Sequence, residues 1–392
     1  MLENLPQVGA DPLWELLAEF QADKRKDKID LLVGVYRDET GVTPVMENVK
    51  SAENQLANQA ASKAYGMLSG NGTFNRNIAK FILGADNPRL HNQRTIQTVG
   101  ASGALRVLAD FIKRLSPNVV IWNTNPGYIN HQPIMEGAGL QVSSFRWQDK
   151  GGELDINACF ADLEDAVKGD VILLHASCHN PTGIDPSLEQ WQQFVDFCKR
   201  KKITPFIDIA YQGFGETPEQ DAAGLRLFVE QIDEVLITAS CSKNMGLYCE
   251  RTGAAIVMTN DEEKLAGIST LLERITRSNY SMPPNHGAAI ANILFSNQEP
   301  WLEELASYRD RVNGIRQGLT DALTKLGAPS SMQVIGTQKG MFSMLPLTKD
   351  QMIALRKDHG IYGVPNGRIN LAGLKQSQTE VLAKALIAVL DK

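Results

Sequence analysis

Short apolar runs rich in β-branched residues alternate with longer segments of helical periodicity between about residues 95 and 259. Bounded runs of this kind predict buried strands, here at 119–122, 171–175, 205–208, 234–238 and 254–258. Strands that alternate with helices are typical of a mostly parallel sheet covered by helices on both faces. We therefore predict an α/β fold, whose ligands bind beyond the carboxyl ends of the strands.

The segment 185–201 illustrates the predicted helices. Asp185 can cap it and Pro186 fits its first turn, and the apolar residues at helical spacing are Trp191, Phe194 and Cys198. The pattern is less regular up to about residue 45 and from about residue 310. In the latter part we expect helices at 300–326, 349–357 and 376–390, with short strands near Ile361 and Arg368.

Composition narrows the class of protein. The 392 residues are 43% hydrophobic and 21% charged, as in an ordinary soluble globular protein. The net charge of −6 argues against a surface for nucleic acid or anionic membrane. The five cysteines are scattered, odd in number and without a C-x-x-C pair, so we expect reduced thiols in a cytoplasmic protein. Neither a secretory signal nor an apolar run of roughly 20 residues is visible.

A lysine ends one predicted strand. Lys243 lies in Ile237-Thr-Ala-Ser-Cys-Ser-Lys-Asn-Met-Gly246, with Ser240 and Ser242 beside it and Arg251 shortly after. Its amine can form an imine with a carbonyl cofactor, while the hydroxyls and the guanidinium bind that cofactor's phosphate. This run alone is weak evidence, and three other segments supply complementary chemistry.

The first of these segments is a turn of small residues that opens a predicted helix. Gly100, Ser102 and Gly103 precede apolar residues at helical spacing. Free backbone N–H groups and the positive end of the helix dipole make such a turn a ready anion site. A capped helix start without a ligand remains an alternative.

The second and third segments follow two buried strands. Asn180 in Cys178-His-Asn-Pro-Thr-Gly183 is either a plain turn residue or a neutral hydrogen-bonding group that points into the strand-end crevice. Asp208 ends an apolar strand, so its buried carboxylate needs strong hydrogen-bond donors or a cation, and a pyridinium nitrogen would supply that charge. Tyr211 could donate a hydrogen bond to a phenolate oxygen on the same pyridinium ring. The alternative for Asp208 is a helix cap after the strand.

Two arginines are candidates for binding carboxylates. Arg368, between a turn and a short strand, could hold one bidentately, and Arg277 has the same status; either could equally be a solvated surface residue. Three histidines, His131, His175 and His179, fit no zinc spacing, so we expect no metal and favour core or supporting roles for them.

Taken in order, these segments resemble the pyridoxal-phosphate aminotransferases of the aspartate/aromatic amino acid subgroup, with fold type I. The similarity runs from Ile29-Asp-Leu-Leu-Val-Gly-Val-Tyr-Arg-Asp-Glu-Thr-Gly41 to Arg368-Ile-Asn-Leu-Ala-Gly373. The near-diagnostic runs are Cys178–Gly183, 208–214 and 240–248. The resemblance implies a small α+β domain from residues 1–45 and 311–392, and a large cofactor-binding domain over 46–310.

The resemblance also implies roles around pyridoxal 5'-phosphate. Lys243 would form the internal Schiff base and shuttle the proton at Cα, and Asp208, supported by His131, would pair with the pyridinium. Asn180 and Tyr211 would bind the ring oxygen. The remaining cofactor contacts implied are Tyr128 over the ring, Ala101 in the phosphate turn, and Ser102, Ser240, Ser242, Arg251 and Tyr65 at the phosphate.

For the substrate, the resemblance implies that Arg368, with Gly34 close by, grips the α-carboxylate, next to Tyr128 and Asn180. Arg277 would meet the side-chain carboxylate of a dicarboxylic substrate. Tyr65 and Arg277 would come from the partner subunit, which implies a homodimer. The other partners implied are amino acid and 2-oxo acid substrates only.

The chain departs from the subgroup's pattern around the substrate pocket. Tyr128 stands where a tryptophan is usual over the ring, and Ala101 makes the phosphate turn Gly-Ala-Ser where Gly-Gly-Thr is common. Leu32 replaces a usual glycine. Ala64 and Met282 stand where strict aspartate enzymes tend to have asparagine. With Ser102, these changes resemble the aromatic or dual-specificity branch.

We therefore expect reversible transamination between an aromatic or acidic L-amino acid and 2-oxoglutarate, in a ping-pong cycle. The first alternative is elimination or decarboxylation with the same cofactor, because Tyr128 and Ala101 could change which Cα bond lies perpendicular to the ring. The second alternative is a non-catalytic regulator. The chain has neither a basic patch nor spare length for a DNA-binding segment, which disfavours it.

Overall fold

The computed structural model describes residues 2–5, 9 and 11–390. The chain divides into two compact units. The small unit comprises Met1–Thr43, Val312–Thr337 and Met341–Lys392, and the large unit comprises Pro44–Arg311 and Gln338–Gly340. Among the residues so described, no helix has the length and apolar character needed to cross a membrane.

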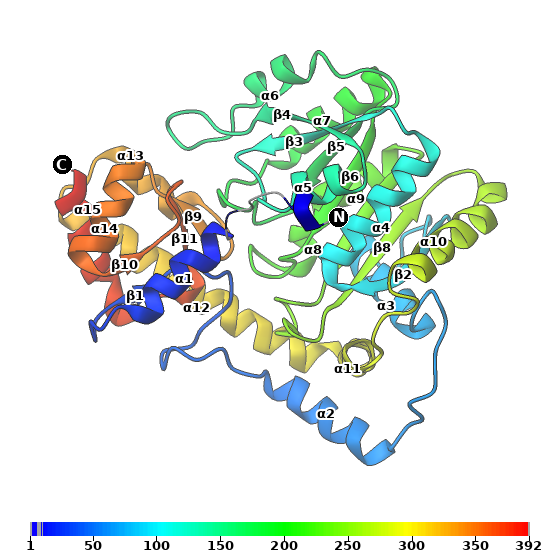
Figure 1. Cartoon of the computed structure of the whole chain (residues 1–392), viewed down its shortest axis with the longest axis horizontal. Helices are drawn as coiled ribbons and strands as arrows, with labels where there is room; N and C mark the ends of the chain where they lie inside the picture. The colour runs from blue at the N-terminus through cyan, green and yellow to red at the C-terminus, as the bar shows by residue number, and fades with distance from the viewer. Residues whose placement is uncertain (1, 6–8, 10, 391–392) are drawn as a thin grey trace. The chain divides into compact units, whose positions relative to one another are not determined.

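A seven-stranded sheet forms the centre of the large unit (Figure 1). Its order is β2-β8-β7-β6-β5-β3-β4, and every pair from β4 to β7 is parallel, whereas β8 is antiparallel to both of its neighbours. The strands are β2 Gln93–Val99, β3 Val120–Asn125, β4 Gln141–Arg146, β5 Val171–His175, β6 Thr204–Ile209, β7 Val235–Ser240 and β8 Thr252–Met258. The predicted α/β class is confirmed; the two edge strands, β2 and β4, are additional to the prediction.

Burial explains which strands the sequence reveals. Every residue of β5, β7 and β8 is buried, as expected for strands covered by helices on both faces. The edge strand β4 buries only Phe145 along its length and therefore shows no apolar run. Strand β2 buries only three consecutive residues, starting at Ile96.

Helices cover this sheet. Helix α4 packs with α10 on one face, where Leu108 and Leu272 join Phe206 and Val257 of the sheet in one apolar cluster. Helices α7 and α9 pack together through Trp191 and Phe228, whose ring centroids are 6.0 Å apart. The helices of this unit are α2 Glu47–Gln59, α3 Gly72–Leu83, α4 Gly100–Leu115, α5 His131–Gly137, α6 Ile156–Leu163, α7 Leu188–Lys201, α8 Pro218–Asp221, α9 Ala223–Gln231, η2 Glu262–Lys264, α10 Leu265–Asn279 and α11 His286–Ser296.

The predicted start of α7 was wrong. The helix begins at Leu188, and Ser187 caps it: its hydroxyl accepts from the N–H of Gln190 at 3.2 Å, and the Gln190 side chain accepts from the N–H of Ser187 at 2.8 Å. This reciprocal capping box satisfies two N–H groups of the first turn. The carboxylate of Asp185 therefore serves a different purpose, in the loop before the helix.

The small unit has two short sheets and a separate apolar core. Strand β1 (Ile29–Asp30) pairs in parallel with β10 (Ile361–Tyr362), and β9 (Phe342–Met344) pairs antiparallel with β11 (Arg368–Asn370). The helices expected near the C-terminus are confirmed as α14 Lys349–His359 and α15 Thr379–Leu390. The other elements are η1 Leu2–Asn4, α1 Pro12–Ala22, α13 Ser330–Gln333, η3 Val334–Thr337, η4 Leu371–Gly373 and η5 Gln376–Gln378, while the confirmed helix α12, Gln298–Lys325, spans the boundary at Arg311.

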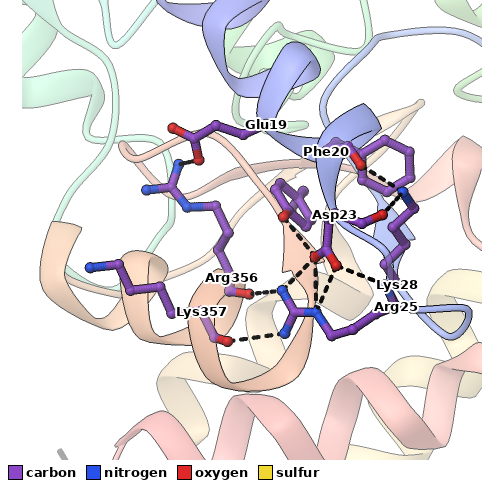
Figure 2. Close-up of polar contacts among 8 residues, drawn as sticks. Glu19, Phe20, Asp23, Arg25, Lys28, Arg356 and Lys357 are labelled. Atoms are coloured by element: carbon purple, nitrogen blue, oxygen red, sulfur yellow. Dashed lines mark hydrogen bonds and ion pairs between the residues drawn. The ribbon is translucent and has the colours of Figure 1, made fainter.

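Hydrogen bonds from Arg25, which is ion-paired with Asp23, join two segments of the small unit that are more than 300 residues apart in the sequence (Figure 2). The Arg25 guanidinium donates to Asp23 and to the carbonyl oxygens of Arg356 and Lys357, both at 3.0 Å. These carbonyls belong to the last turns of α14, where a positive charge is favourable. The hydroxyl of Tyr362 also donates to Asp23, at 2.8 Å.

We expect Asp23→Asn to lower the melting temperature of the protein at neutral pH. The hydrogen bonds from Arg25, from its backbone N–H and side chain, hold the pKa of Asp23 well below its ordinary value. A carboxyl whose folded-state pKa is depressed contributes stability above its unfolded pKa of about 3.9 and loses it as the pH falls further. Thermal unfolding of both proteins should therefore show a gap at pH 7 that narrows below about pH 4. A constant gap would contradict this explanation.

Candidate active site

The loops after β3, β5, β6 and β7 carry most of the predicted site residues. The carboxyl ends of parallel strands meet at one edge of the sheet, and the chain reverses its direction of winding between β3 and β5, where ligands of such sheets bind. The amine of Lys243 lies 4.7 Å from the centre of the Tyr211 ring. The side-chain amide of Asn180 lies 3.5 Å from the Tyr211 hydroxyl. The structure thus brings these three predicted residues together.

Lys243 has an unusually acidic ammonium group. Burial lowers its pKa from 10.5 to about 8, and the positive charge of Arg251 adds to this, while the negative charge of Asp208 acts in the opposite direction. A lysine with such a pKa has a substantial fraction of neutral amine near pH 8, and only the neutral amine attacks a carbonyl. The position of Lys243 therefore favours imine chemistry.

Asp208 is a buried carboxylate with two fixed donors. The Thr238 hydroxyl donates to one oxygen at 2.7 Å, and Nε2 of His131 lies 3.1 Å from the other. Burial alone would raise the pKa of Asp208, but the hydrogen bond and the charge of His131 outweigh it, so the net shift is downward. Helix α8 after it is capped by Thr217, so the helix-cap alternative for Asp208 was wrong.

The rings of three histidines pack against one another next to Asp208. The ring centroids of His131 and His175 are 4.9 Å apart and nearly parallel, and His179 meets His175 edge-on at 4.5 Å. Burial lowers the pKa of His175 to about 3, so this ring is neutral. Ligand atoms of His131, His175 and Asp208 lie within 4.8 Å of one another, close enough for a metal. The nitrogen of His131 nearest Asp208 already makes a hydrogen bond, which favours a supporting role.

The start of α4 and Arg251 form a positively charged cradle. The helix begins at Gly100 without a side-chain cap, which leaves backbone N–H groups of its first turn free of such a partner. A Cβ at position 100 would lie 2.4 Å from Nη2 of Arg251, so the guanidinium sits directly against this turn. Two positive groups side by side are the arrangement that a phosphate stabilises. The alternative of a capped helix start is thereby disfavoured.

Serines complete this cradle. The guanidinium of Arg251 donates to the Ser242 hydroxyl at 3.3 Å and to the Tyr248 carbonyl at 3.0 Å. The Ser240 hydroxyl accepts from the N–H of Ser242 at 3.1 Å, which fixes the turn just before the lysine. Ala101 and Ser102 are half-buried in the first turn of α4. These residues fit the phosphate of the expected cofactor.

Tyr128 lies in the loop after β3, beside the three histidines. Its ring meets His131 edge-on, with centroids 5.2 Å apart, and its hydroxyl accepts from the side chain of Asn130 at 3.3 Å. The side chain is half-buried. It therefore reaches the same region as Asp208.

Four predicted residues lie apart from this cluster or in the other unit. Tyr65 is 98% exposed and Arg277, in the last turn of α10, is also exposed. Arg368 and Gly34 belong to the small unit, where both contact Phe342: the Arg368 guanidinium lies 4.9 Å over its ring. Their roles stay predictions.

Thr238 is a functional candidate that the sequence reasoning missed. It is paired with Asp208 across β6 and β7, so the two side chains lie side by side. Aligning the two predicted strands by their carboxyl ends could have revealed this contact, because parallel neighbours place equivalent positions next to each other.

The family model described as aminotransferase class I and II matches residues 26–386. The chain is 41% identical over 391 residues to the aromatic-amino-acid aminotransferase of Pseudomonas aeruginosa, covering 98% of each chain. It is 40% identical to the aspartate aminotransferase of Escherichia coli K12, over the full length of both. Among solved structures, the aromatic-amino-acid aminotransferase of Burkholderia pseudomallei covalently bound to pyridoxal phosphate matches with a TM-score of 0.96 at 36% identity, covering 100% of this chain and 99% of that one.

Proposed function

The chain belongs to the aminotransferase class I and II family. From this premise we propose which residues bind the cofactor, bind the substrate and transfer the proton during amino transfer. The chain is a pyridoxal-phosphate-dependent transaminase of the aromatic and aspartate type. The elimination or decarboxylation alternative finds no support among these relatives. The observation that carries the proposal is the placement of the Lys243 amine, with its lowered pKa, over Tyr211 and close to the buried Asp208.

When bound, pyridoxal phosphate supplies an aldehyde carbon and an electron-withdrawing pyridinium ring. In the proposal, the cradle of Arg251, Ser242 and the α4 turn holds the phosphate. Asp208 keeps the ring nitrogen protonated, and its bonds from Thr238 and His131 keep the carboxylate ionised and oriented. This preorganisation stabilises positive charge at the ring nitrogen without later rearrangement.

Lys243 is the proposed base. Its amine would hold the cofactor in the resting protein and, once free, would carry a proton between the substrate Cα and the cofactor carbon, first as base and then as acid. A pKa near 8 suits this task, because a base works best when its pKa lies near the operating pH. Asn180 and Tyr211 are the proposed donors to the ring oxygen, and Tyr128 the ring that faces the cofactor.

We propose 2-oxoglutarate and glutamate as one substrate pair, with an aromatic amino acid, aspartate or both as the other. Arg368, with Gly34 beside it, would bind the α-carboxylate by a planar bidentate fork. The similar proteins carry both names, so support for aspartate and for aromatic substrates is nearly equal. Three residues that differ from the subgroup, Leu32, Ala64 and Met282, make the proposed pocket more apolar, which favours an aromatic side chain.

The proposal includes a homodimer. Tyr65 and Arg277 are both exposed in a single chain, although the resemblance assigns them to the cofactor and substrate site. A partner subunit that received them would account for both exposed side chains. We also place the protein in the cytoplasm, which the five free cysteines support.

We expect Arg277→Ala to reduce kcat/KM for aspartate and glutamate by about 10²-fold and to leave phenylalanine and tyrosine nearly unchanged. The physical reason is the loss of a charge-assisted pair with the side-chain carboxylate, which is worth a few kcal/mol. An amino-donor panel with a fixed 2-oxo acid acceptor measures this. An equal loss for all donors would contradict the assignment.

Hybrid dimers provide the control for the second subunit. The Lys243→Ala and Arg277→Ala proteins are unfolded, mixed in equal amounts and refolded together. The mixture would then contain hybrid dimers in which one of the two sites has both native residues. Activity toward aspartate should then rise above that of either protein alone, to about a quarter of the wild-type value. No recovery would mean that Arg277 acts within its own subunit.

A further inference from the structure

The turn that carries Asn180 is tied by a carboxylate from further along the same loop. Asp185 accepts from the N–H of Cys178 at 2.7 Å and from the N–H of His179 at 2.9 Å, the two residues just before Asn180. Cys178 has a φ of +51°, a conformation that a non-glycine residue holds only when its surroundings fix it. Asp185 therefore maintains a turn that would otherwise relax.

A second carboxylate ties the loop that carries Tyr211. Asp221, at the end of α8, is buried and accepts from the N–H groups of Gly213, Gly215 and Glu216 at 2.7, 3.0 and 2.9 Å. The first of these follows Tyr211 by two residues. Burial raises the pKa of Asp221, and the three N–H donors act against this rise. The loop after β6 is thus held by three N–H groups that donate to one carboxylate.

The two loops contact each other, and Lys339 interacts with both of them. A Cβ on Gly215 would lie 3.1 Å from Sγ of Cys178, so the loops pack closely there. The N–H of Lys339 donates to the Gly183 carbonyl at 2.7 Å, and its ammonium pairs with Glu216. Its positive charge lowers the pKa of both Asp185 and Asp221, although burial still raises that of Asp185 to about 6. Both carboxylates act as acceptors of backbone N–H groups, two for Asp185 and three for Asp221.

We propose that Asp185 and Asp221, the carboxylate pair, are positioning residues for amino transfer, each fixing the turn that presents one donor to the ring oxygen of the cofactor. Asp185 acts through Asn180, and Asp221 acts through Tyr211. The amide and hydroxyl of these two donors lie 3.5 Å apart, a separation that lets both point at one shared oxygen. This inference rests on the proposed function, because that oxygen belongs to the cofactor.

The test is a spectrophotometric pH titration of the visible band of the lysine-bound cofactor. Hydrogen bonds to the ionised ring oxygen matter most when the lysine–cofactor linkage has lost its proton, because that proton no longer balances the negative charge of the oxygen. Such bonds therefore lower the pKa of the linkage, and their loss raises it. Asp185→Asn puts an NH₂ group against a backbone N–H and displaces the Asn180 turn. We expect the titration midpoint to rise by about 0.5 to 1 pH unit. Asp221→Asn, acting through Tyr211, should raise it as well, and serves if the first variant folds poorly.

Two comparisons separate positioning from general loss of stability. Asp155→Asn is the matched control. Asp155 is also partly buried, and at the start of α6 it accepts a hydrogen bond from the backbone N–H of Ala158 at 2.9 Å. This variant should lower the melting temperature and leave the midpoint unchanged. In an Asn180→Ala background, Asp185→Asn should add almost nothing to the midpoint shift, because the two residues act in series.

Native midpoints in both carboxylate variants would overturn the inference, and so would a full Asp185→Asn shift that persists without the Asn180 side chain. The proposed function is tested separately, on the unmodified protein. If that protein gained neither a visible band nor amino-transfer activity with pyridoxal phosphate, the proposed function would be wrong, and the inference would be overturned with it.

Discussion

Lys243→Ala is expected to lower transamination by at least about 10⁴-fold, since the variant loses the residue proposed as both the attacking amine and the base. The structure gives the reason, because Lys243 is the lysine whose pKa burial brings down to about 8, and its amine lies over Tyr211. The fold should survive, because Lys243 lies in the turn after β7 and its side chain is not part of the apolar core.

Borohydride reduction followed by peptide mass spectrometry measures the attachment directly. The unmodified protein should carry the cofactor on the peptide that contains residue 243, and the variant on none. Lys264→Ala is a suitable control, because Lys264 is an exposed lysine with surface ion pairs. A variant with more than about one hundredth of the original activity would contradict the role of Lys243 as the base.

Asp208→Asn should cost about 10²- to 10³-fold in kcat, the usual loss when one preorganised electrostatic partner is removed from a reacting centre. The neutral amide no longer favours a protonated ring nitrogen, so the ring withdraws electrons less strongly. It also leaves Thr238 and His131 facing an altered partner. Cofactor affinity should fall as well, because a buried charge pair is lost.

Asp170→Asn is the matched control for this variant. Asp170 is equally buried in the large unit, and its carboxylate accepts from the N–H groups of Val120 and Val167 and from the Trp122 indole. Its replacement should reduce stability by about 1 to 3 kcal/mol without a selective loss of kcat. Steady-state kinetics and thermal unfolding on both variants separate the two effects. Equal kinetic losses would show that Asp208 has only a structural role.

The sequence predicts the central strands well and the edges poorly. Strands β5, β7 and β8 are covered on both faces and therefore appear as continuous apolar runs. Strand β4 has a single buried residue, Phe145, so no periodicity marks it. Edge strands depend on backbone pairing with one neighbour, and side-chain pattern carries little information about that.

The site shows the same division. Asp208 lies near the end of β6, while Asn180 and Lys243 follow β5 and β7, so the strand-end rule places all three at one edge of the sheet. Asp185 was expected to cap α7, because acidic residues before helices often do so. The helix is instead capped by Ser187, whose capping box with Gln190 is the stronger sequence signal. Lys339 comes from more than 100 residues further along the chain, and no local pattern indicates such a contact.

The pairing of β1 with β10 has a consequence for synthesis on the ribosome. Residues 29 and 30 pair in register with residues 361 and 362. The first strand of the small unit therefore stays unpaired while more than 300 further residues are translated. The seven strands of the large unit, by contrast, are all complete at Met258. Closing so long a loop is slow. Nascent chains should therefore acquire the large unit first and expose the apolar face of residues 29–32 to chaperones until translation is nearly complete.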